Sequence, residues 1–132
     1  MEKMLSSWQP AALSLFRFIA GLLLFQFGVA KILHFPPDSP FAKVQLTSLY
    51  GAAGSFELIL GGLLMLGLFT RPVAFVLSGE MAFAYFIGHF PKNFYPVING
   101  GSLAIALCFA CLYFATAGGG PISLDAVLRK KE

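Results

Sequence analysis

Four ionisable side chains lie inside long apolar stretches of this sequence: Arg17, Lys31, Glu57 and Glu80. In a hydrocarbon environment a lone charge near the middle of a helix costs about 2.5–3.5 kcal/mol. Arg17 and Lys31 have long side chains that can extend to the nearest interface, whereas the two glutamates are shorter. Each glutamate must therefore be protonated, paired or in contact with a wet cavity. Such groups either pair and fix how helices pack, or form a polar site between helices.

The apolar stretch that carries both cations, residues 12–34, has one polar face. At helical spacing this face combines small residues with charges, namely Arg17, Gly21, Leu24, Gly28 and Lys31. Glycines let a second helix approach closely, and lipid does not tolerate unpaired charges. We therefore expect this face to point into the protein and to meet acidic partners there.

The composition indicates an integral membrane protein with one domain, residues 1–132. Hydrophobic residues make up 58% of the chain, charged residues 11%, and the mean hydropathy is +0.79. A soluble four-helix bundle needs a polar stripe on every helix, and this chain has too few polar residues to provide four. The net charge of +3 is spread over segment ends and does not form a patch, which argues against nucleic acid as a partner.

Four apolar segments predict an all-α fold, a membrane four-helix bundle with four transmembrane helices. Their approximate bounds are 12–34, 51–70, 72–90 and 97–117. Loops that contain proline follow the first and third segments, and a very short turn at Arg71 and Pro72 joins the second to the third. Outside these spans, five Lys and Arg residues lie on the side of the two termini and two lie on the other side. The positive-inside rule therefore predicts that both termini are cytoplasmic.

Orientation converts sequence position into depth, at about 1.5 Å of rise per residue. Arg17 and Glu80 then lie at compatible depths near the cytoplasmic side, and we expect them to form an intramembrane ion pair. Lys31 and Glu57 match in the outer half, with Gln26 close to the same level. A direct pair between Arg17 and Glu57 is rejected, because these bounds leave about 13 Å of mismatch in depth.

The outer half is the better candidate for a binding site. The expected polar cluster there, a candidate ligand-binding site, comprises Gln26, Lys31, Glu57, Asn99 and Ser102, with His89 as a weaker member. Two simpler interpretations stand beside it: the charges only fix helix packing, and Asn99 only starts the fourth helix. The sequence contains no haem ligand pair across spans, no nucleotide-binding loop and no metal-spaced cluster, so no metal site and no catalytic constellation are predicted.

Cys108 and Cys111 have the spacing of a redox dithiol, but they lie in the middle of an apolar span. Reactive pairs usually stand at a helix N-terminus, where the helix dipole favours the thiolate. Both cysteines also belong to a seam of small residues along the fourth span. Packing is the favoured interpretation, and dithiol chemistry is the alternative.

The chain resembles the DoxX family of small bacterial four-span membrane proteins. The resemblance rests on the order of several short motifs: Arg17 with Gly21, Gly28 and Lys31, ELILGG at 57–62 with Gly67 and Thr70-Arg71, Met81 with Ala82 and His89, NGG at 99–101, and GPISLD at 120–125. Similar proteins often follow the NGG motif with a glutamate, where this chain has Ser102. That departure removes an acid from the outer half.

The resemblance implies a multi-pass protein of the bacterial inner (plasma) membrane that is linked to redox metabolism. Some relatives look like membrane subunits of quinone-linked, sulfur-compound oxidoreductases, which implies a quinone as the cofactor and a soluble redox protein as a cytoplasmic partner. The alternative function is a non-enzymatic scaffold that anchors a partner through the turn at Arg71 and the basic tail 129–131. A small transporter is a third, less favoured reading, and it would require a homo-oligomer to line a path.

Overall fold

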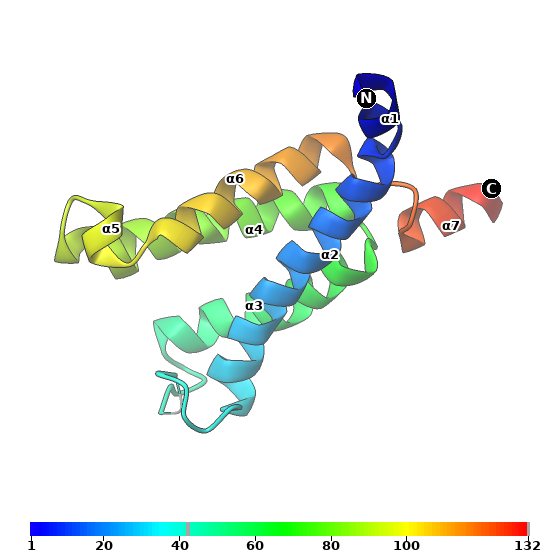
Figure 1. The fold of residues 1–132 in the computed structure, drawn as a ribbon. Helices are drawn as coiled ribbons and strands as arrows, with labels where there is room; N and C mark the ends of the chain where they lie inside the picture. The colour runs from blue at the N-terminus through cyan, green and yellow to red at the C-terminus, as the bar shows by residue number, and fades with distance from the viewer. Residues whose placement is uncertain (42, 132) are drawn as a thin grey trace.

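The computed structural model describes residues 1–41 and 43–131, and only the backbone of residues 130 and 131. All regular secondary structure in this part of the chain is helical, as the sequence predicts. In chain order the α-helices are α1 (Glu2–Ser7), α2 (Gln9–Gly28), α3 (Leu49–Leu66), α4 (Thr70–Ala84), α5 (Pro96–Asn99), α6 (Ser102–Ala117) and α7 (Leu124–Lys131) (Figure 1). α2 continues into a π-helical turn, Val29–Leu33. α4 continues into a second π-helical turn, Tyr85–His89, and a 3-10 turn, Phe90–Lys92.

Within the described residues, three continuous helical segments are long and apolar enough to cross a membrane: Gln9–Leu33, Leu49–Leu66 and Thr70–Lys92. The expected fourth segment, 97–117, is divided into α5 and α6. Gly100 separates the two helices with a φ of 75°, a left-handed conformation that glycine adopts without steric cost. α6 is apolar but has only 16 residues, a rise of about 24 Å.

The helices form two pairs, because α2 packs mainly against α3 and α4 packs mainly against α6 (Figure 1). The pairs meet where the chain begins and ends, and they diverge away from that point. We call the meeting region the terminal end and the opposite region the distal end. Contacts between the start of α2 and the chain after α6 close the terminal end: Ser14 Oγ donates to the carbonyl of Gly119 at 3.2 Å.

Glycine permits the close contact between α2 and α3. A Cβ atom placed on Gly21 would stand 2.5 Å from the backbone nitrogen of Met65, and one on Gly61 would stand 2.8 Å from that of Phe25. The predicted polar face of α2 is buried in full, from Arg17 through Gly28 to Lys31. Helical periodicity therefore identified the correct face, and small residues set the distance to its neighbour.

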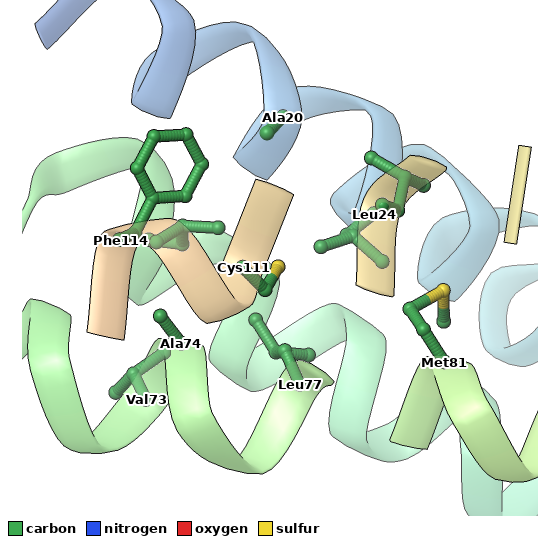
Figure 2. Close-up of a cluster of buried hydrophobic side chains, with 10 residues drawn as sticks. Ala20, Leu24, Val73, Ala74, Leu77, Met81, Cys111 and Phe114 are labelled. Atoms are coloured by element: carbon green, nitrogen blue, oxygen red, sulfur yellow. The ribbon is translucent and has the colours of Figure 1, made fainter. Parts of the chain in front are cut away.

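The hydrophobic core lies between the two helix pairs (Figure 2). Ala20 and Leu24 of α2 face Leu77 of α4, and Cys111 and Phe114 of α6 fill the space between them. Cys111 has no exposed surface. This position supports packing as the role of Cys111, since its side chain is part of the hydrophobic core.

The C-terminal segment caps the start of α4 at the terminal end. Asp125 accepts hydrogen bonds from the backbone N–H groups of Phe69 (2.8 Å) and Thr70 (2.9 Å), and its own N–H donates to the carbonyl of Gly67 at 2.9 Å. Burial alone would raise the pKa of Asp125, but the hydrogen bonds from Thr70 and Phe69 and the charge of Arg129 hold it below its ordinary value. This carboxylate therefore stays ionised and fastens α7 to the turn between α3 and α4.

Candidate functional site

A buried ion pair joins α2 to α3 in their distal halves. Lys31 Nζ donates to Oε1 of Glu57 at 2.8 Å and to Oε2 at 3.1 Å, and the two side chains are only 8% and 1% exposed. Lys31 lies in the π-helical turn that extends α2, and Glu57 lies in the middle of α3. A Cβ on Gly54 would stand 2.6 Å from Cβ of Lys31, so the lysine needs a glycine opposite it. The structure thus brings together two members of the expected polar cluster.

Three aromatic rings surround the ammonium group of Lys31. Its Nζ lies 5.7 Å from the ring centroid of Phe27, 5.0 Å from that of Phe41 and 5.8 Å from that of Tyr50. Aromatic faces attract cations, and the attraction strengthens where water is excluded. One carboxylate and three rings therefore surround the end of the lysine side chain. Phe41 comes from the segment between α2 and α3, and Tyr50 comes from the first turn of α3. The sequence interpretation missed both.

Glu80 lies beside this ion pair. Its carboxylate is next to that of Glu57 and within electrostatic reach of Lys31. Both carboxylate oxygens of Glu80 are closed off from solvent, and neither has a hydrogen-bond partner of normal geometry among the described residues. The site therefore contains two acids and one base, all within the apolar part of the protein.

The predicted ion pair between Arg17 and Glu80 is wrong. Arg17 lies at the terminal end, where its Nη1 donates to the carbonyl of Gly119 at 3.1 Å. Glu57 lies nine residues before the end of α3, and Glu80 lies ten residues after the start of α4. Both carboxylates thus stand about 14 Å from the turn that joins these helices. The prediction failed because the depth of each residue was counted from assumed membrane boundaries. In two antiparallel helices joined by a short turn, residues equally far from that turn lie at the same level.

Asn99 and Ser102 do not join Lys31 and Glu57 in the structure. The amide group of Asn99 is buried and bonds to residues close to it in the chain. It donates to Tyr85 Oη at 3.2 Å and to the carbonyl of Asn93 at 2.9 Å, and it accepts from the N–H of Gly101 at 2.8 Å. These bonds fasten the turn that precedes α6. Ser102 is exposed at the first position of that helix.

His89 also belongs to this turn, because its Nδ1 lies 3.1 Å from the carbonyl oxygen of Asn99. The expected cluster is therefore split between the two helix pairs. Arg71 likewise has a structural contact, since its Nε donates to the carbonyl of Thr116 at 3.3 Å and links α4 to the end of α6.

Gln26 lines a cleft that borders the ion pair. The cleft has a volume of about 480 Å³ and lies between the distal half of α2 and the segment that follows it. Its walls are mostly apolar. They contain four phenylalanines and two polar side chains, namely Phe25, Phe27, Phe35, Phe41, Gln26 and Ser39. Phe27 and Phe41 belong both to the cleft wall and to the aromatic surround of Lys31. A flat apolar ligand in this cleft would thus stand one aromatic layer away from a buried cation.

Comparison with known proteins identifies the family. The family model described as DoxX matches residues 12–90, which include most of α2, all of α3 and α4, and the four ionisable residues of the apolar segments. The chain belongs to the DoxX family. A protein of Haemophilus influenzae, described only as an uncharacterized protein, is 37% identical to this DoxX chain over 138 aligned positions. These positions cover 96% of this chain and 98% of that protein. No solved structure matches the DoxX chain.

Proposed function

We propose that this DoxX chain is a four-span protein of the bacterial inner membrane, with both termini in the cytoplasm, and that it serves as a quinone-holding subunit of a redox system. The observation that carries the proposal is the aromatic cleft beside the Lys31–Glu57 pair. Its position at the distal end of α2 is accessible to a molecule that diffuses within the bilayer, since Gln26 and Phe35 are exposed. The match to the DoxX family adds support, because the resemblance to that family implies a link to quinone-dependent redox metabolism.

The chemistry of the cleft suits a quinone ring. A quinone is a planar apolar ring with carbonyl oxygens at its edge, so it needs aromatic faces for stacking and a small number of hydrogen-bond donors. Phe25 and Phe41 supply rings, while the amide of Gln26 and the hydroxyl of Ser39 supply donors. A bound quinone would supply electron-carrier chemistry, and the residues of the cleft would orient it and exclude water.

Thermal unfolding of the purified protein in lipid nanodiscs tests this assignment. A short-chain ubiquinone analogue and a naphthoquinone analogue serve as probes. A ligand that binds the folded state raises the unfolding temperature in a concentration-dependent manner. We expect at least one quinone to raise the unfolding temperature of the wild type. Gln26→Leu and Phe41→Leu should each need about ten times more quinone for the same rise, which corresponds to a loss of about 1.4 kcal/mol in binding free energy.

Gln45→Leu is the matched control, because Gln45 is exposed in the same segment and does not line the cleft. It should respond to quinone as the wild type does. Equal responses from the wild type and Phe41→Leu would show that quinone does not bind in this cleft, and the absence of any response would remove the quinone from the proposal.

One observation favours a second function, the anchoring of a partner protein at the terminal end. α7 is amphipathic, and its apolar side chains Leu124, Val127 and Leu128 are exposed. The scaffold reading gains no support from Arg71, which is engaged with Thr116. Purification from the native membrane in mild detergent tests this function: a soluble redox protein that co-purifies with the wild type should be lost from a Val127→Ser, Leu128→Ser variant. Retention of that protein would exclude α7 as the docking element.

A further inference from the structure

The charge balance of the buried site is incomplete. Lys31 supplies one positive charge, and Glu57 and Glu80 can supply two negative charges. Lys31 directs its hydrogen bonds to both oxygens of Glu57, so that pair is complete by itself. The carboxylate of Glu80 is left over, closed off from solvent and without a hydrogen-bond partner of normal geometry. An ionised carboxylate in that position would carry a buried, uncompensated charge, which is far more costly than a neutral carboxylic acid.

From this arrangement we infer that Lys31, Glu57 and Glu80 together form an intramembrane binding site for one exchangeable proton. With that proton the three groups sum to zero charge, and the acid O–H of Glu80 has the carboxylate of Glu57 beside it as an acceptor. The reaction is simple proton binding: the carboxylate of Glu80 takes a proton from a hydronium ion, which becomes water, and the carboxylate becomes a carboxylic acid. Each of three elements contributes one charged group to the site: α4, α3 and the turn after α2.

The neighbours of Glu80 favour a proton over a metal ion. The titratable groups that face it are Glu57 from α3, Lys31 from the turn after α2 and the thiol of Cys111 from α6. A hard cation such as Na⁺ or Ca²⁺ requires about six oxygen ligands. The two carboxylates of the site supply only four oxygens, and the ammonium group of Lys31 would repel a second cation. No cluster of three or more potential metal ligands occurs among the described residues.

Infrared spectroscopy of the protein in nanodiscs at neutral pH tests the inference without any ligand. A protonated carboxyl group gives a C=O band distinct from carboxylate bands, and the band shifts on transfer to D₂O if the proton exchanges. Of the six acids in the sequence, the other four lie outside the apolar segments and should be ionised. We therefore expect the band of one carboxylic acid per chain in the wild type, shifted in D₂O.

Charge neutrality predicts the band in each variant. Glu80→Gln should lose the band, and Glu57→Gln should lose it as well, because Glu80 then ionises against Lys31. Lys31→Met should double the band, because both acids are then protonated. The double variant Lys31→Met, Glu57→Gln should keep one band. Because its site carries no net charge, this variant tests the inference even if the single variants fail to fold. Glu2→Gln, at an exposed position, should match the wild type.

Three outcomes would overturn the inference. A wild-type spectrum without the band would show that Glu80 is ionised. A band that persists in Glu80→Gln would place the proton elsewhere. A wild-type band that appears in N-methylglucamine chloride but disappears in sodium chloride would identify a metal-cation site. Because these spectra require no quinone, they test the proton-binding site independently of the proposed function of the cleft.

Discussion

The contact between α2 and α3 makes a sharp prediction at two adjacent glycines. A Cβ on Gly61 would stand 2.8 Å from the backbone nitrogen of Phe25 and 3.1 Å from its Cα. A Cβ on Gly62 would stand 3.6 Å from the ring of Phe25, which is an ordinary contact. Gly61→Ala must therefore push α2 and α3 apart by about 0.7 Å, whereas Gly62→Ala requires no movement.

A gap of about 0.5–1 Å removes a quarter to a half of the dispersion energy of each affected contact, and overpacking of this kind costs about 1–3 kcal/mol. We expect Gly61→Ala to lower the free energy of unfolding by that amount, and Gly62→Ala to leave it within about 0.5 kcal/mol. Denaturant titration of both variants in the same detergent, followed by circular dichroism, measures the difference. Equal stability of the two variants would refute the reasoning, because their distances to Phe25 are the only basis for separating them.

Three further predictions concern other parts of the chain. In a background without native cysteines, a cysteine at Lys43 should react with an impermeant thiol reagent in intact cells and one at Arg71 should not; the reverse would overturn the orientation. Replacing Cys108 and Cys111 by alanine should preserve the thermal stability of the protein, whereas Cys111→Leu should overpack the core and cost about 1–3 kcal/mol. Asp125→Ala should cost about 0.5–2 kcal/mol as a lost helix cap. Because folding lowers the pKa of Asp125, its contribution should be present above about pH 4 and disappear as the pH falls through the folded-state pKa, and Asp125→Ala should not show this loss in unfolding titrations against pH.

Much of the fold follows from local rules that a single sequence carries. The apolar segments and the glycines and prolines between them predicted where the three long helical segments begin and end. The predicted ends lie within about four residues of Gln9–Leu33, Leu49–Leu66 and Thr70–Lys92. The 3.6-residue period predicted that Arg17 and Lys31 share a buried face, and both are less than a tenth exposed. The break at Gly100 was missed, because a left-handed glycine inside an apolar run leaves no mark on hydropathy.

The partners of the buried charges could not be derived in the same way. Depth counted from assumed membrane boundaries carried errors of several residues, and a shift of one helical turn, about 5.4 Å, is enough to exchange partners. The mistake at Arg17 and Glu80 is of this kind. The turn at Gly67, which sets the register of α3 against α4, would have been the better reference for the depth of both glutamates.

By itself, the sequence determined that this is a helical membrane protein with charges on inward faces, because burial and helix formation depend on residues close together along the chain. Only the tertiary structure decided that Glu80 joins Lys31 and Glu57, that Phe41 and Tyr50 close over the lysine, and that Asp125 caps α4. Each of these contacts joins residues from different segments. Such contacts depend on helix register and on the path of the connecting segments, and no local pattern encodes either one.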